Sequence, residues 1–214
     1  MKNVYSIVLS SDVVEMIDRL AYENGTNRSN MINQILAEYV SYTTPEMRFR
    51  EIFSRMQDML AGSAFKALEP SDTMFSLRSA LAYKYNPTVK YSVELYRGAE
   101  REIGELRVSL RTQNEALVLY MTQFYRLWQR IEERLRGEAV AAVEIADGKY
   151  AKRLVLEAHG GPAEIDVGRV IAAYIDAFDR ALKTYFYHLE APTRAAAEVE
   201  EIYRRYMMEN RVLI

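Results

Sequence analysis

Residues 3–42, NVYSIVLSSDVVEMIDRLAYENGTNRSNMINQILAEYVSY, decide the fold that we predict for the first part of the chain. From Val4 to Leu9 side chains alternate with a period of two, which is typical of a β-strand. A serine pair then caps a helix whose apolar residues recur at helical spacing. An Asn-Gly pair ends that helix, and the Thr-Asn pair after it can cap a second one. The stretch therefore predicts one strand followed by two short amphipathic helices.

Such a segment needs a partner. A lone strand has two unpaired edges, and about forty residues rarely enclose a sufficient core. A second copy corrects both defects, because two strands can pair antiparallel while four helices close over their inner face. The sequence therefore predicts a homodimer that is formed at least partly by this segment.

Three motifs in this segment point to a known family. They are Leu9-Ser10-x-Asp12, Ile17-Asp18-x-Leu20-Ala21 and Gly25-Thr26-Asn27-Arg28-Ser29-x-x-Ile32. In this order they resemble the ribbon-helix-helix DNA-binding domains of the MetJ/Arc type, over roughly the first fifth of the chain. The resemblance implies a dimeric two-stranded ribbon laid in the major groove of double-stranded DNA. Carried over residue by residue, it places base contacts at Val4, Ser6 and Val8, and a phosphate at Asn27, Arg28 and Ser29.

Two features depart from that family's pattern. Two of the three base-reading positions are valine, which offers no hydrogen bond to a base edge. Residues 1–42 also hold three basic groups against five acidic ones, whereas DNA affinity depends largely on neutralising phosphates. The alternative is that this module only dimerises the chain.

The rest of the chain predicts a bridging helix over residues 43–62 and a C-terminal domain over 63–214. In that domain the expected helices are about 71–83, 114–137, 166–189 and 193–210, and a β-hairpin is expected over 88–97 and 105–111. Residues 138–158 fit either continued helix or a second hairpin around Asp147-Gly148. The predicted fold class is mainly α with minor β: a ribbon-helix-helix module at residues 1–42, then a mostly helical α+β domain with one or two β-hairpins.

The predicted hairpin carries a second candidate nucleic-acid surface. Residues 76–112 hold seven basic and four acidic groups, and Lys90, Arg107 and Arg111 fall on its outer face. Tyrosines between them could stack on bases while the cations neutralise phosphates. The simpler interpretation is a solvated face over a helical core.

Composition narrows the function further. The 214 residues are half apolar, carry a net charge of -2 and contain no cysteine, so disulfides and thiolate metal sites are excluded. No apolar run approaches the roughly twenty residues that cross a bilayer, and the first residues do not resemble a secretory signal. We therefore expect a cytoplasmic protein that does not enter a membrane.

Catalytic and cofactor chemistry have weak support. His159 and His188 lie in different segments without metal-ligand spacing, so no metal is expected. Gly160-Gly161 lacks the strand and helix of a phosphate-binding loop. The pairs Glu132-Glu133 and Glu200-Glu201 point in different directions on a helix. We therefore expect neither a cofactor nor an enzyme.

The predicted function is sequence-specific DNA binding by a homodimer, as a transcription regulator or as an accessory factor in plasmid partition or transfer. The C-terminal domain would then bind a small molecule or a protein. The alternative is an interaction protein that the module only dimerises and whose C-terminal domain binds a protein partner. An antitoxin-like protein is a third interpretation, although residues 63–214 are large and apolar for a flexible toxin-binding tail.

Overall fold

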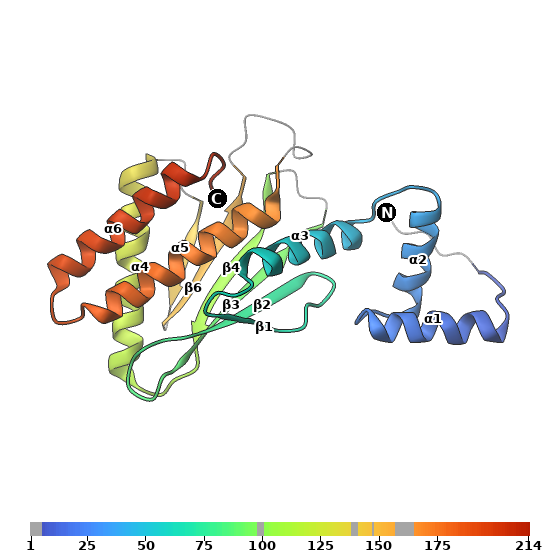
Figure 1. Cartoon of the computed structure of the whole chain (residues 1–214), viewed down its shortest axis with the longest axis horizontal. Coiled ribbons are helices and arrows are strands. Elements are labelled where there is room, and N and C mark those ends of the chain that lie inside the picture. Colours follow the sequence, from blue (N-terminus) through green and yellow to red (C-terminus); the bar gives the residue numbers. More distant parts are fainter. Residues whose placement is uncertain (1–5, 98–100, 138–140, 147, 157–164) are drawn as a thin grey trace. The chain divides into compact units, whose positions relative to one another are not determined.

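The computed structural model describes residues 6–97, 101–137, 141–146, 148–156 and 165–214. These residues form six helices and a six-stranded antiparallel sheet (Figure 1). They divide into two compact units, which we call the N-terminal unit (Met1–Arg48) and the C-terminal unit (Phe49–Ile214). None of the helices in the described ranges is long and apolar enough to cross a membrane.

The N-terminal unit consists of α1 (Ser11–Glu23), α2 (Arg28–Tyr39) and the first residues of α3 (Pro45–Leu60). Gly25, with a φ of 58°, ends the turn after α1 in the left-handed region that glycine adopts easily. The Asn27 side chain then caps α2 by accepting a hydrogen bond from the Asn30 N–H at 3.0 Å. The buried core of these helices is small and consists of Ile17, Ala21 and Met31, with Ile32 packed against it.

The predicted N-terminal ribbon is wrong. Residues 6–10 form no strand, and the chain is helical from Ser11. Alternating side chains are compatible with a strand but do not form one, because a strand also needs a hydrogen-bonded neighbour. Residues 6–10 have no such neighbour among the described residues. Val4, at the start of the expected strand, lies outside the described ranges.

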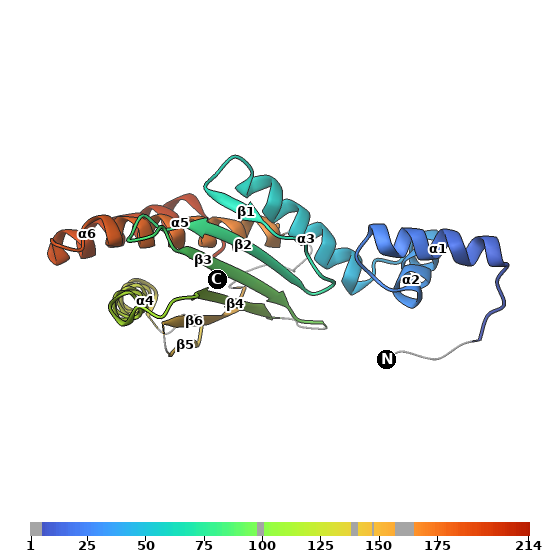
Figure 2. The ribbon, with the colours of Figure 1, turned by 90° about the horizontal axis from the view of Figure 1, so that it is seen from below.

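The centre of the C-terminal unit is the sheet, whose order is β1-β2-β3-β4-β6-β5 (Figure 2). All neighbouring strands are antiparallel. Their bounds are β1 (Phe65–Ala67), β2 (Met74–Ala80), β3 (Thr88–Leu95), β4 (Glu102–Leu110), β5 (Val143–Ala146) and β6 (Lys149–Val155).

The sheet corrects the predicted fold class. A mostly helical domain with one or two hairpins is wrong, because β3–β4 and β5–β6 are parts of one six-stranded sheet. The helix predicted over about 71–83 is instead β2, which pairs with β1 on one side and β3 on the other. Asp147, at the predicted second turn, lies outside the described residues, while Gly148 follows it with a φ of 69°.

Three long helices complete this unit: α4 (Glu115–Arg136), α5 (Val167–Tyr187) and α6 (Pro192–Glu209). Local signals start each one. The Asn114 side chain accepts from the Leu117 N–H at 3.1 Å, and the Asp166 side chain accepts from the Arg169 N–H at 3.0 Å. Pro192 stands at the start of α6, where its fixed φ suits the first turn.

Helices cover one face of the sheet, which we call the inner face. Phe53 of α3 stacks on Phe75 of β2 with ring centres 5.6 Å apart. The Tyr91 hydroxyl of β3 donates to Asp179 of α5 at 2.8 Å, and α6 packs along α5 (Figure 1). Since side chains alternate along a strand, the intervening residues lie on the opposite face, which we call the open face. Much of the open face is exposed, so the unit has one covered and one accessible side.

Gly104 brings β3 and β4 unusually close together. A bulge separates Glu102 from Gly104 in the pairing of β4 with β6. A Cβ added at Gly104 would overlap the carbonyl oxygen of Glu94. Only glycine fits this approach of two backbones.

Candidate nucleic-acid interface

A row of cations crosses the open face of the sheet. Lys66 of β1 is the register partner of Arg78 of β2, and Arg78 is in turn the partner of Lys90 of β3. Register partners of adjacent strands point to the same face. All three side chains are exposed. Ser109 of β4, the partner of Lys90, extends the row with a neutral polar group.

The charges of this cationic row (Lys66, Arg78 and Lys90) are not neutralised within the described parts of the chain. None of the three forms an ion pair or a side-chain hydrogen bond with a described residue. Directly opposed side chains in a sheet stand about 5 Å apart, and like charges in such positions are destabilising. The row therefore costs stability unless an anion lies over it.

The other end of the open face has the opposite arrangement. Arg107 of β4 forms ion pairs with Glu94 at 3.0 Å and with Glu105. Arg153 of β6 pairs with Glu102 at 3.0 Å. Burial, followed by the charges of Glu105 and Glu94, raises the pKa of the nearby Tyr96 hydroxyl. Arg107 and Arg153 at this end are thus compensated by carboxylates, whereas the three cations of the row are not.

The turn between β2 and β3 adjoins the cationic row. Tyr85 in this turn is fully exposed, and Lys84 beside it is also exposed. Tyr85 and Asn86 have φ values of 65° and 45°, a region in which non-glycine residues are uncommon. Hydrogen bonds hold the turn, including one from the Leu81 N–H to the Pro87 carbonyl at 2.9 Å. The turn thus presents an aromatic ring and a cation beyond the ends of both strands.

The residues predicted for the second surface lie as follows. Lys90 belongs to the cationic row, Arg107 lies on the same face but is ion-paired, and Arg111 is exposed one residue after β4 ends. The outer face predicted from the sequence included neither Lys66 nor Arg78, although Arg78 was counted among the seven basic groups of residues 76–112. The pairing register of the strands places both residues beside Lys90, and it can be assigned only once β1 and β2 are recognised as strands.

The residues predicted to contact DNA in the N-terminal unit are largely used locally. Arg28 donates two hydrogen bonds to Asp18, from Nε to Oδ1 at 2.6 Å and from Nη2 to Oδ2 at 2.5 Å. This interaction lowers the pKa of the Asp18 carboxyl. The Asn27 side chain caps α2. Ser29 is exposed in the first turn of α2, and Ser6 and Val8 are exposed before α1. Val4 lies outside the described residues.

The N-terminal unit also exposes a large set of apolar side chains. They come from the segment before α1, from both helices and from the residues after α2: Ile7, Val8, Leu9, Val13, Met16, Leu20, Tyr22, Ile35, Leu36, Tyr39, Val40 and Tyr42. We call this set the N-terminal apolar surface. It is far larger than the buried core of the unit, and exposed apolar patches of this kind mark interaction sites.

The residues considered for metal binding or catalysis lie as follows. Within them, no group of three or more His, Asp or Glu side chains could hold a metal ion. His188 forms a contact of 3.0 Å with Glu198, and His159 and the Gly160-Gly161 pair lie outside the described ranges. The ion pair of Lys152 with Glu132 is completely buried, so substrate cannot reach it.

A comparison with known proteins finds no family model, no curated protein and no solved structure that matches the chain.

Proposed function

We propose that the chain is a DNA-binding protein, rather than an enzyme, that acts as a homodimer in the cytoplasm. The observation that carries this proposal is the unneutralised cationic row on the open face. In this proposal, Lys66, Arg78 and Lys90 bind the phosphates of double-stranded DNA. The resemblance of residues 3–42 to DNA-binding domains suggests the processes in which such binding would serve, namely transcription regulation, plasmid partition or DNA transfer.

The spacing of the row suits a phosphate backbone. Adjacent strands are about 4.8 Å apart, so three cations in register span about 10 Å. One strand of duplex DNA carries a phosphate about every 3.4 Å along the axis, or about three over that length. Lys84 and Tyr85 in the adjoining turn add a cation and a ring within reach of the same strand.

The homodimer is supported by the N-terminal apolar surface. The buried apolar cluster of Ile17, Ala21 and Met31 is too small to stabilise a unit of this size, so the exposed apolar groups of the unit need a cover. A second copy offers the same surface, which is the basis of a twofold interface. Two linked chains present two cationic rows, and simultaneous engagement of both strengthens binding without a new contact.

Salt-dependent binding of the full chain to a fluorescent duplex tests the proposal. The variant Lys66→Gln/Arg78→Gln/Lys90→Gln removes three phosphate contacts per chain. We expect its slope of log affinity against log salt to become shallower by about 3 per bound chain, and its affinity to fall at least about tenfold. The matched control, Arg126→Gln/Arg130→Gln/Arg205→Gln, removes the same charge from exposed positions of α4 and α6. Equal slopes for the two variants would rule out the row as the DNA site.

A second candidate function is an interaction protein that the N-terminal unit only dimerises. It is favoured by the apolar surface together with the pairing of Arg28 to Asp18, which removes a cation from a DNA-facing role. In both candidates Leu36→Asp should convert a dimer to a monomer in light scattering. Leu119→Asp, which changes an exposed side chain of α4, should not. A dimer without affinity for duplex DNA at low salt would favour the second candidate.

A further inference from the structure

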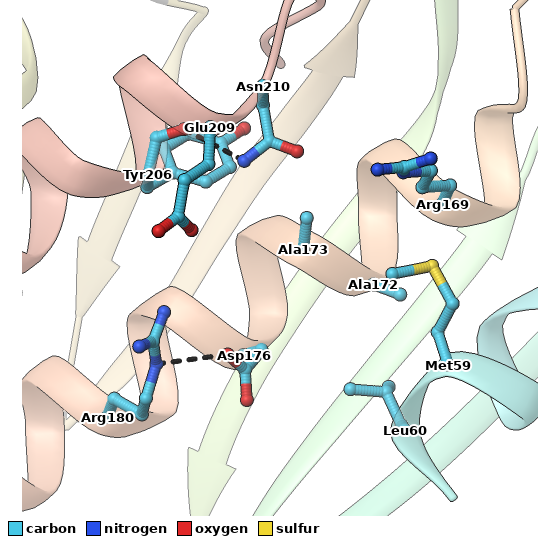
Figure 3. Close-up of a pocket in the computed structure, with 10 residues that line it drawn as sticks. All are labelled: Met59, Leu60, Arg169, Ala172, Ala173, Asp176, Arg180, Tyr206, Glu209 and Asn210. Atoms are coloured by element: carbon cyan, nitrogen blue, oxygen red, sulfur yellow. Dashed lines mark hydrogen bonds and ion pairs between the residues drawn. The ribbon is translucent and has the colours of Figure 1, made fainter.

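A pocket of about 310 Å³ lies among α3, α5 and α6 of the C-terminal unit (Figure 3). Its floor includes Ala172 and Ala173 of α5, whose small side chains leave room above the helix. Met59 and Leu60, at the end of α3, supply an apolar wall. The volume is at the lower end of the roughly 300–1,000 Å³ that small-molecule sites occupy, so a ligand of few atoms fits it.

Two opposite charges border this pocket without meeting. Arg169 on α5 and Glu209 on α6 both line it, yet neither forms an ion pair or a side-chain hydrogen bond with any residue in the described ranges. Both also line an adjoining pocket of about 330 Å³, so the two charges stand where the cavities meet. In Figure 3 the Arg169 guanidinium lies on one side of Ala173, and Glu209 lies on the other.

The remaining polar groups of the pocket are already engaged, with one exception. Asp176 and Arg180 neutralise each other through a contact of 3.0 Å. The Asn210 amide nitrogen donates to the Tyr206 carbonyl at 2.8 Å, which fixes the orientation of the amide. Its oxygen is left as an acceptor and points away from the Glu209 carboxylate, toward the side of Arg169 (Figure 3). The free charged groups are therefore the Arg169 guanidinium on one side and the Glu209 carboxylate on the other.

We propose that this pocket binds a free α-amino acid with an apolar side chain. The carboxylate pairs with Arg169, which presents a fork suited to both oxygens. The ammonium group lies against the Glu209 carboxylate. The side chain packs on Met59 and Leu60. Glu209 would repel the second carboxylate of a dicarboxylate, and Arg169 would repel the second ammonium group of a diamine. The two charges therefore select a molecule that carries one positive and one negative group.

Calorimetric titration of the full chain with three isosteric probes tests this assignment. L-Leucine carries both charges, 4-methylpentanoate lacks the ammonium group, and 3-methylbutylamine lacks the carboxylate. We expect L-leucine to bind with a Kd of about 1 mM or tighter and each single-charge probe to bind at least about tenfold more weakly. Arg169→Gln and Glu209→Gln should each weaken L-leucine binding by a similar factor, while Arg205→Gln on the exposed side of α6 should not.

The methyl resonance of Met59 gives a second measurement that needs no variant of the charged residues. In methionine-methyl-labelled protein, with Met59→Leu identifying the signal, L-leucine should shift that resonance in proportion to occupancy. The inference is overturned if L-leucine does not bind, if the Met59 signal stays unmoved at saturation, or if both charge variants retain the parent affinity. None of these measurements involves DNA, so they stand apart from the proposed function.

Discussion

The buried ion pair of Lys152 on β6 and Glu132 on α4 gives a sharp prediction about stability. Both side chains are completely buried, and Lys152 Nζ lies 2.7 Å from Glu132 Oε1. The same Nζ lies 3.3 Å from the Tyr174 hydroxyl and 4.4 Å from the centre of its ring. Glu132 Oε2 has no hydrogen-bond partner among the described residues. Lys152 is therefore the principal compensation for a buried carboxylate.

Replacing Lys152 with Met should lower the free energy of unfolding of the C-terminal unit by about 3–5 kcal/mol, because an uncompensated charge remains in the core. Tyr174 contributes little to this loss. Its hydroxyl still accepts from Trp128 Nε1 at 2.8 Å and lies 3.0 Å from the Tyr150 hydroxyl. The methionine fills much of the volume of the lysine stem, so a cavity is not the main cost.

The double variant Lys152→Met/Glu132→Leu separates charge from packing. It removes both charges, and we expect its stability to return to within about 1 kcal/mol of the parent chain or to exceed it. Urea unfolding followed by circular dichroism, at unchanged m-value, measures both variants. A loss below about 1 kcal/mol in the single variant, or a double variant as unstable as the single one, would refute the reasoning.

Three further predictions concern local features. Arg28→Gln should raise the pKa of Asp18 toward 3.8, as measured by an NMR titration. In the parent chain Arg28 lowers this pKa, so the ion pair stabilises the fold above about pH 4, and this stabilisation is lost as pH falls through the folded-state pKa of Asp18. Burial raises the pKa values of Tyr150 and Tyr174 well above 10.0, so stability should fall as pH rises past 10.0, and both should ionise only with unfolding in an absorbance titration. Gly104→Ala should lower the unfolding free energy by about 1–3 kcal/mol, because β3 leaves no room for a methyl group; a neutral result in urea unfolding would contradict the close strand approach.

The helices were predictable because their signals are local. Asn27 and Asn114 cap the helices that were expected after them, and the apolar period of α4, α5 and α6 continues over many turns. The hairpin of β3 and β4 was also predictable, since its alternation is regular and its loop is short in sequence.

The missed parts of the fold depend on distant partners. Phe75 and Leu77 of β2 fit both an apolar helical stripe and a strand, and only pairing with β1 and β3 decides between them. Residues 6–10 show the reverse case, in which alternation predicted a strand that the structure does not form.

The same limit applies to the candidate sites. Lys90 was expected on an outward face, but the row needs Lys66 and Arg78, which register alone brings beside it. Arg169 and Glu209 lie on different helices, and the close packing of α5 with α6 places both on one pocket.

The surroundings of Trp128 give the chain an optical reporter of one unit. It is the only tryptophan of the chain, and it is fully buried in the C-terminal unit. Its indole N–H donates a hydrogen bond to the Tyr174 hydroxyl, and its ring centre lies 5.0 Å from that of Tyr203. The N-terminal unit has no tryptophan, and among its described residues Tyr22, Tyr39 and Tyr42 are exposed. Indole emission therefore follows the melting of the C-terminal unit alone, while far-ultraviolet dichroism registers the helices of both. A difference between the two melting curves would measure how independently the two units unfold.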